Sequence, residues 1–161
     1  MVRQLIPLKE IIKLNTRLFI NLLEDVTEEI AYKRMDKNSN PIIFIVIHLL
    51  DARFYIARFC GVKNKNPFKE KFDAIKSSDD LSGLPRLDEI KNVWNDISTE
   101  LVDGIGSVSE GRLEQNPRME FPVEDKTIIG AITFLTQHES YHLGQIGLLR
   151  KSFGLSPLKY N

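Results

Sequence analysis

Apolar residues recur at helical spacing in four separate stretches of this 161-residue chain, and this pattern constrains the fold more than any other feature. Steps of three and four residues place side chains on one face of an α-helix. The four predicted helices run from Leu8 to Val26, from Pro41 to Cys60, from Leu87 to Val108, and from Asp125 or Thr127 to Phe153. Four amphipathic helices of this length predict an all-α protein built as a four-helix bundle.

The predicted helix ends carry residues that suit them. Asn40 stands before Pro41, and an Asn cap followed by proline at the first helical position favours a helix start. Gly61 and Gly154 follow the second and fourth helices, where glycine commonly ends a helix. The second helix is apolar on nearly all sides at its beginning, so we expect it to be buried.

The connections differ in length, which bears on topology. The first two helices are joined by a short loop, so we expect them to be antiparallel neighbours. Residues 62–85 and 109–125 are rich in polar residues or contain Gly and Pro, and they are predicted to be long connections. The first of them can cross the length of a helix, ~30 Å for ~20 residues. The second and third helices can therefore run parallel, with long crossovers.

Composition narrows the class of protein. The length suits a single domain over residues 1–161, and Lys+Arg and Asp+Glu are equal at 22 each. Because no charge excess indicates nucleic acid or an anionic membrane surface, we expect neither as a partner. The longest apolar stretch, Pro41–Leu50, is too short to span a bilayer, and the N-terminus lacks a signal-peptide pattern. One cysteine, Cys60, excludes an internal disulfide, so a cytoplasmic location is the default expectation.

The chain has three histidines, His48, His138 and His142. The last two are four residues apart, so they share one face of the fourth helix, and that face is its apolar stripe. His48 lies in the most apolar helix. A buried imidazole without a partner costs ~1–3 kcal/mol, and one shared metal ion would satisfy all three. The alternative is a metal-free core in which each imidazole bonds a carbonyl or water.

We predict a divalent metal ion bound by these three imidazoles, with at least one coordination position open. Three protein ligands plus an open position are typical of catalytic rather than structural metal sites. Zinc and nickel are the leading candidates, since imidazole suits both.

The stretch His138–His142 also matches H-E-x-x-H, the pattern in which zinc metalloproteases supply two ligands and a general-base glutamate. No Asp, Glu or His follows His142, so the usual downstream third ligand is absent. Only His48, some 90 residues upstream, could replace it. The sequence therefore disfavours a metalloprotease.

Three polar residues near the histidines have two interpretations each. Gln145 either holds the second nitrogen of a ligand or a bound water, or makes a polar contact between helices. Asp51 either supports the metal site or forms a surface ion pair with an arginine. Glu139 lies ~100° from His138 around the helix, so a solvated or loop-bonding role is favoured over a catalytic one.

Two further residues are assigned to structure. Cys60 lies ~18 Å from His48 along a straight helix, which is too far to share its metal, so we predict a core or helix-end residue. Trp94 is predicted to anchor the bundle.

The stretch 138–146 reads HESYHLGQI and is followed by LLR at 148–150 and by Gly154. It resembles the C-terminal signature of the DinB-like (YfiT-like) superfamily, H-x-x-x-H-x-G-Q-I with L-R and a later glycine. The segment HLLDA at 48–52 resembles the first-histidine motif of that family. The likeness extends to helix number, helix order and length over most of the chain.

The resemblance implies a bundle with up-down-down-up order, a metal centre at His48, His138 and His142, and a homodimer. It also implies a small-molecule substrate, with a transferase that uses a low-molecular-weight thiol as the leading activity. A metal-dependent hydrolase, with Glu139 or Asp51 as a base, and a non-catalytic metal-binding bundle are the alternatives. From the residues themselves, apolar side chains expected at the surface give the dimer further support: Phe54, Tyr55 and Phe59.

Overall fold

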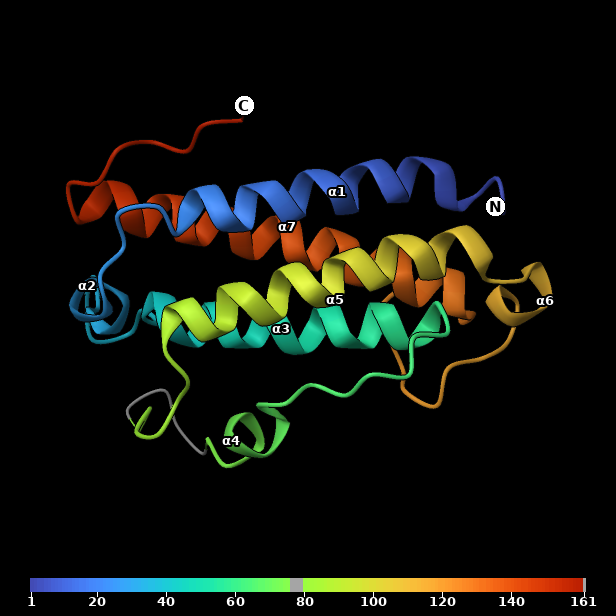
Figure 1. The fold of residues 1–161 in the computed structure, drawn as a ribbon, viewed down its shortest axis with the longest axis horizontal. Helices are drawn as coiled ribbons and strands as arrows, with labels where there is room; N and C mark the ends of the chain where they lie inside the picture. The colour runs from blue at the N-terminus through green and yellow to red at the C-terminus, as the bar shows by residue number, and fades with distance from the viewer. Residues whose placement is uncertain (76–79, 161) are drawn as a thin grey trace.

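The computed structural model describes residues 1–75 and 80–160, and four long helices dominate it (Figure 1). They are α1 (Leu5–Leu22), α3 (Ile42–Phe59), α5 (Leu87–Ser107) and α7 (Ile128–Ser152). Short helices interrupt the connections: α2 (Glu28–Tyr32), α4 (Lys69–Asp73) and α6 (Glu110–Leu113). No strand occurs in the described ranges, so the all-α prediction is confirmed. Residues 76–79 of the predicted 62–85 connection lie outside the described part.

The four long helices follow an up-down-down-up order. In Figure 1, α1 and α7 run in one direction and α3 and α5 in the other. The predicted parallel pair, α3 and α5, is therefore confirmed. α1 and α3 each pack mainly against α5 and α7, so they occupy opposite corners of the bundle. The prediction that they are neighbours is wrong, because residues 23–41 contain α2, which packs on α3 and carries the chain across to the far corner.

The helix ends follow the predicted chemistry closely. Gly61 and Gly154 adopt φ of 94° and 77°, the left-handed region that glycine enters without steric cost. After α3, the N–H of Val62 donates to the carbonyl of Ala57, and after α7, that of Leu155 donates to Arg150, as in a Schellman motif. The start of α3 differs by one residue from the prediction, since Pro41 itself occupies the extended N-cap position instead of Asn40.

Trp94 of α5 anchors the core, as predicted. Its ring is fully buried and stacks on Phe19 of α1 with centroids 3.9 Å apart. The predicted position of Cys60 is also confirmed, since it is buried as the C-cap of α3.

Phe54 and Phe59 are buried within the chain and Tyr55 is half-buried, so the prediction that these side chains form an exposed apolar surface is wrong. Residues 61–70 run back along α3 on the side of Phe54 and Tyr55 (Figure 1), and Phe121 packs against Phe59 with ring centroids 6.0 Å apart.

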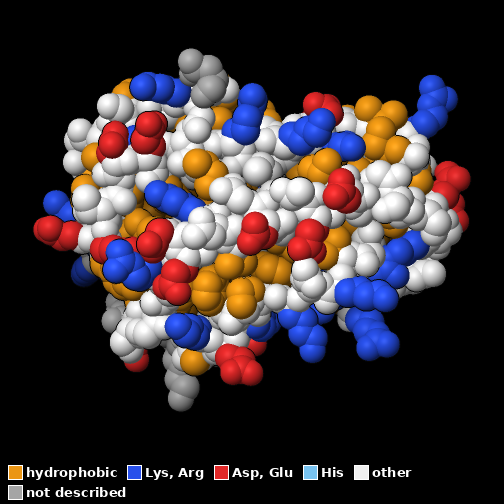
Figure 2. All heavy atoms as spheres, in the orientation of Figure 1, with side chains coloured by type: hydrophobic (Ala, Val, Ile, Leu, Met, Phe, Trp, Pro, Cys, Tyr) orange, Lys and Arg blue, Asp and Glu red, His pale blue; other side chains and the backbone are white. Residues whose placement is uncertain are grey.

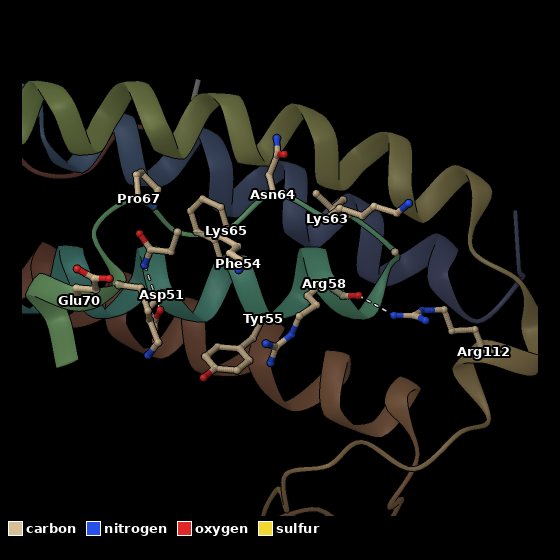
Figure 3. Close-up of a pocket in the computed structure, with 14 residues that line it drawn as sticks. Asp51, Phe54, Tyr55, Arg58, Lys63, Asn64, Lys65, Pro67, Glu70 and Arg112 are labelled. Carbon is tan, nitrogen blue, oxygen red and sulfur yellow. Dashed lines mark hydrogen bonds and ion pairs between the residues drawn. The ribbon is translucent and has the colours of Figure 1, made fainter.

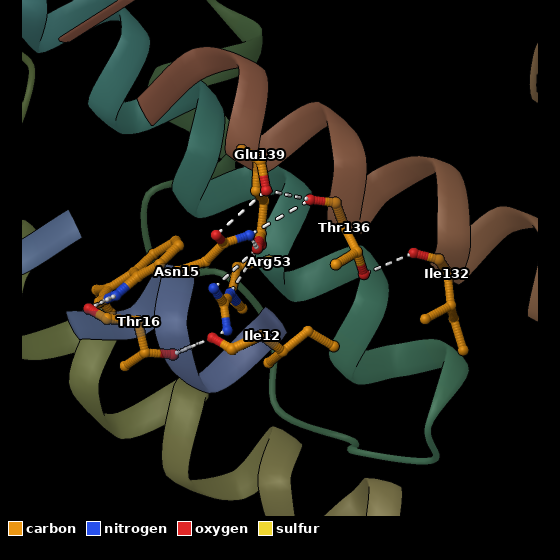
Figure 4. A network of polar contacts seen from close by, with 9 residues as sticks. Ile12, Asn15, Thr16, Arg53, Ile132, Thr136 and Glu139 are labelled. Atoms are coloured by element: carbon orange, nitrogen blue, oxygen red, sulfur yellow. Dashed lines mark hydrogen bonds and ion pairs between the residues drawn. The ribbon is translucent and has the colours of Figure 1, made fainter. Parts of the chain in front are cut away.

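A buried polar network ties the helices together (Figure 4). The guanidinium of Arg53 on α3 contacts both carboxylate oxygens of Glu139 on α7, at 2.8 Å and 2.9 Å. Asn15 of α1 donates to the same carboxylate, and Arg53 also donates to Thr16 of α1. Burial raises the pKa of Glu139, and the Arg53 guanidinium opposes that rise.

The prediction that Glu139 is solvated is therefore wrong. Its side chain has no exposed surface. The physical reason is the position of α7 in the bundle. This helix packs against both α1 and α3, so it buries two faces and not only the one that carries His138.

The outer surface mixes charges of both signs. On the face shown in Figure 2, basic and acidic side chains are interspersed, and hydrophobic side chains form separate small patches. Within the described residues, no helix is long and apolar enough to cross a membrane.

Candidate metal centre

The three histidines meet where α3 packs against α7. His48 comes from the middle of α3, and His138 and His142 come from successive turns of α7. The Nε2 atom of His138 lies 3.2 Å from Nε2 of His48 and 3.0 Å from Nε2 of His142. The predicted trio is thus brought together from two helices whose histidines are 90 residues apart.

The donor set fits a divalent transition metal. Nitrogen ligands ~2.0–2.1 Å from a tetrahedral zinc ion are ~3.3 Å from one another, close to the observed separations. Each of the three histidines offers one ring nitrogen, and these atoms all lie within 4.8 Å of one another. Three converging nitrogen lone pairs repel one another unless a proton or a cation lies between them, and a shared cation removes that cost for all three.

The environment keeps the imidazoles in the form that binds metals. Burial lowers the pKa of His48, His138 and His142, and His138 falls to about 4 because the other two histidines add to the effect. Imidazole must be neutral to act as a ligand. The three imidazoles are therefore neutral at neutral pH, and metal binding does not require free energy to deprotonate them.

Gln145 orients one of the rings. Its Oε1 lies 2.6 Å from Nδ1 of His142, and its Nε2 donates to the hydroxyl of Tyr141 at 3.1 Å. An amide oxygen can only accept, so Nδ1 carries the proton and Nε2 of His142 is left with a free lone pair. This is one of the two roles considered for Gln145. In contrast, Nδ1 of His138 is buried and has no partner in the part of the chain that the structure describes.

Aromatic rings surround the histidines on several sides. Phe44 and Phe72 lie 6.4 Å and 6.0 Å from the His48 ring, and Phe134 and Tyr141 lie 5.8 Å and 5.1 Å from the rings of His138 and His142. These walls limit water, yet all three histidines remain partly accessible. The three rings are therefore in contact with solvent.

The two carboxylates considered as bases are both engaged elsewhere. Asp51 accepts hydrogen bonds from Asn66 and Lys69, both at 3.1 Å, and is buried. The prediction that Asp51 forms a surface ion pair with an arginine is wrong, because its cationic partner is Lys69 of α4. Glu139 is bonded to Arg53 and Asn15. The sequence analysis did not predict the Arg53–Glu139 pair. Arg53 is one of only two charged residues in the apolar stretch from Pro41 to Ala57. A charged residue in an apolar stretch indicates a buried partner of opposite charge.

Comparison with known families identifies the chain's relatives. A family model of the DinB superfamily matches residues 11–146. The chain belongs to the DinB superfamily. The matched range contains all three histidines of this DinB-superfamily protein and most of its four long helices. A search of curated proteins returns no match.

Proposed function

We propose that this protein is a metal-dependent transferase that joins a low-molecular-weight thiol to a small electrophilic substrate. The observation that supports it is the convergence of the Nε2 atoms of His48, His138 and His142 at 3.0–3.2 Å in a partly accessible site. These residues would hold one divalent ion, zinc or nickel, which acts as a Lewis acid and lowers the pKa of a thiol. The thiol would lose its proton to water, its sulfur would form a bond to the electrophilic carbon, and the leaving group would depart with its electron pair.

The chain does not supply the thiol itself. Cys60 lies at the C-terminal end of α3, twelve residues from His48, and burial raises its pKa to about 12. A thiol that stays protonated at neutral pH is a poor nucleophile. The reactive sulfur must therefore come from a second small molecule.

Hydrolysis is the second candidate, and the structure weakens its case. It calls for a base to activate water, and both Asp51 and Glu139 are held by cationic partners. A non-catalytic metal-binding bundle is the third candidate. A chelator that unfolds the protein would favour a structural ion, whereas one that removes only ligand binding or activity would favour a reactive centre.

Metal content is the first test. Purified protein should carry about one transition metal ion per chain by elemental analysis, and the His138→Ala, His142→Ala double variant should carry almost none. A double variant that retains its metal would refute the centre.

The second test addresses the reaction. Metal-loaded protein is incubated with a model alkylating electrophile and a panel of small thiols, and conjugate is measured by mass spectrometry. We expect a conjugation rate that depends on metal and thiol and is absent in the double variant. Cleavage of an ester or amide without thiol, and no conjugation with any thiol, would replace transfer with hydrolysis.

We further propose, from the family resemblance, that the protein is a homodimer, and, from its single cysteine, that it is cytoplasmic. The buried positions of Phe54 and Phe59 mean that they cannot form the interface. Light scattering that gives the mass of a single chain at high concentration would contradict the dimer.

A further inference from the structure

A second site lies along the outer side of α3, in a pocket of about 820 Å³ between this helix and residues 61–70 (Figure 3). We call it the α3 pocket. Its lining includes five basic side chains and two acidic ones, in a chain whose formal net charge is zero. Lys and Arg side chains gather at the lower right of Figure 2. The charge of the pocket therefore differs from that of the whole molecule.

Among the residues that the structure describes, three of the basic side chains have no acidic partner. Arg58 stacks its guanidinium 4.6 Å from the centroid of the Tyr55 ring. Lys63 and Lys65 are exposed on the opposite wall. Across residues 1–75 and 80–160, no carboxylate lies within ion-pair distance of any of these three side chains. Their charges are thus available to a ligand.

The other charges of the pocket leave its lining positive on balance, because five basic side chains outnumber the two carboxylates. Asp51 pairs with Lys69, whose Nζ lies 3.1 Å from it and 2.7 Å from Asp73, and it accepts a hydrogen bond from the amide of Asn66. Arg112 donates to the carbonyls of Arg58 and Phe59 at the end of α3, so it keeps its positive charge while holding the wall in place. Glu70 is the one remaining carboxylate of the lining, and it is exposed.

The α3 pocket is aligned with the metal centre. His48, Asp51, Tyr55 and Arg58 are spaced by three, four and three residues, so they follow one face of α3. Tyr55 and Arg58 lie ~10 Å and ~15 Å beyond His48 along the helix axis. Lys69 bridges the two regions, since its Nζ lies 5.8 Å from the Tyr55 ring and 5.5 Å from the ring of Phe72, which packs against His48.

We propose that the α3 pocket binds the anionic end, a carboxylate or a phosphate, of the small molecule whose reactive end reaches the three histidines. Arg58, Lys63 and Lys65 bind the anion, and the Tyr55 ring supports the adjoining apolar part. The anion site rests on the charges and shape of the pocket alone, and its link to the histidines rests on the proposed transferase function.

Anion binding is tested with succinate and inorganic phosphate as probes, by calorimetry on the full chain. We expect saturable binding that the variant Arg58→Gln, Lys63→Gln, Lys65→Gln weakens at least tenfold. The control variant loses the same charge at exposed sites elsewhere: Lys37→Gln, Arg118→Gln, Lys151→Gln. Its affinity for the probes should be within twofold of that of the wild type. Preference for one probe identifies the chemistry of the anion and supports the site in either case.

Three results would overturn the pocket: no saturable binding of either probe, unchanged binding by the pocket variant, or equal weakening in the control. The His138→Ala, His142→Ala variant should retain anion binding, so a failed metal centre does not affect this test. The link is tested with a matched pair of thiols, mercaptohexanoate and mercaptohexanol. The pocket variant should raise the KM for the acid at least tenfold and leave that for the alcohol unchanged, whereas equal effects on both would overturn the link.

Discussion

Arg53 and Glu139 form an ion pair in which neither side chain has exposed surface, with Nε and Oε1 2.8 Å apart. Their further partners come from α1, and the guanidinium lies 4.1 Å from the ring of Trp94 on α5. The pair therefore contacts all four long helices. Two charges removed from water are costly unless they are paired and hydrogen-bonded, and Asn15 and Thr16 supply hydrogen bonds to this pair, while Nε of Arg53 and Oε1 of Glu139 contact only each other within the described residues.

Removing one member of this pair should be costly. Arg53→Met leaves the Glu139 carboxylate buried without its cation, and the free energy of unfolding in urea should fall by about 3–5 kcal/mol. Adding Glu139→Leu should recover part of the loss, because it removes the orphaned charge. Lys13→Met breaks an exposed pair with Glu10 and should change stability by less than ~1 kcal/mol. A loss in Arg53→Met no larger than in this control would contradict the expectation.

Gln145 should matter to metal affinity more than to folding. Gln145→Ala removes the acceptor that fixes the His142 ring, and the loss of such a partner typically weakens metal binding ~10–100-fold. Competition with a chromogenic chelator measures the affinity. Gln137→Ala, at an exposed position on the same helix, serves as the matched control and should leave affinity unchanged. Equal affinities of the two variants would show that Gln145 does not support the centre.

Cys60 should be chemically silent in the folded protein. Burial raises the pKa of its thiol to about 12 from an ordinary value of 9.0, so thiolate is absent at pH 8. A disulfide reagent should therefore label the native chain slowly and label one thiol rapidly in denaturant. Stoichiometric labelling within seconds in the native state would argue against this.

The same shift gives a pH dependence of stability. Between pH 9 and 12 the unfolded thiol loses its proton while the folded one keeps it, so the folded state is progressively disfavoured as the pH rises. The stability difference between wild type and Cys60→Ala should change in this direction above pH 9. A difference that is independent of pH would contradict the assignment.

Two glycines of α7 should respond oppositely to alanine. A Cβ at Gly130 would clash with the carbonyl oxygen of Asp125, so Gly130→Ala must displace the segment before the helix and should cost about 1–3 kcal/mol. A Cβ at Gly144 would have no neighbour within 4 Å, and Gly144→Ala should stabilise by up to ~1 kcal/mol. Thermal unfolding of both variants measures the contrast, and the same sign of change in both would refute it.

The sequence predicted the parts of this fold that depend on periodicity. Four long stripes give four long helices, and three histidines on apolar stripes gave the trio that the structure brings together. What it missed depends on packing between helices. The ~100° angle between His138 and Glu139 suggested opposite environments, but a corner helix with two neighbours buries both directions. The short helices α2, α4 and α6 have too few residues to show a periodic pattern. Because α2 was not predicted, the sequence analysis also did not predict that the chain crosses from α1 to α3 at the opposite corner of the bundle.

The position of two ligands on the last long helix has a consequence for how the protein matures. During synthesis from the N-terminus, a nascent chain that has reached residue 127 contains α1, α3 and α5 but only one of the three histidines. Binding of the proposed ion by all three histidines would then follow the emergence and docking of α7. The proposed ion would thus link α3 and α7 only at the last stage of synthesis.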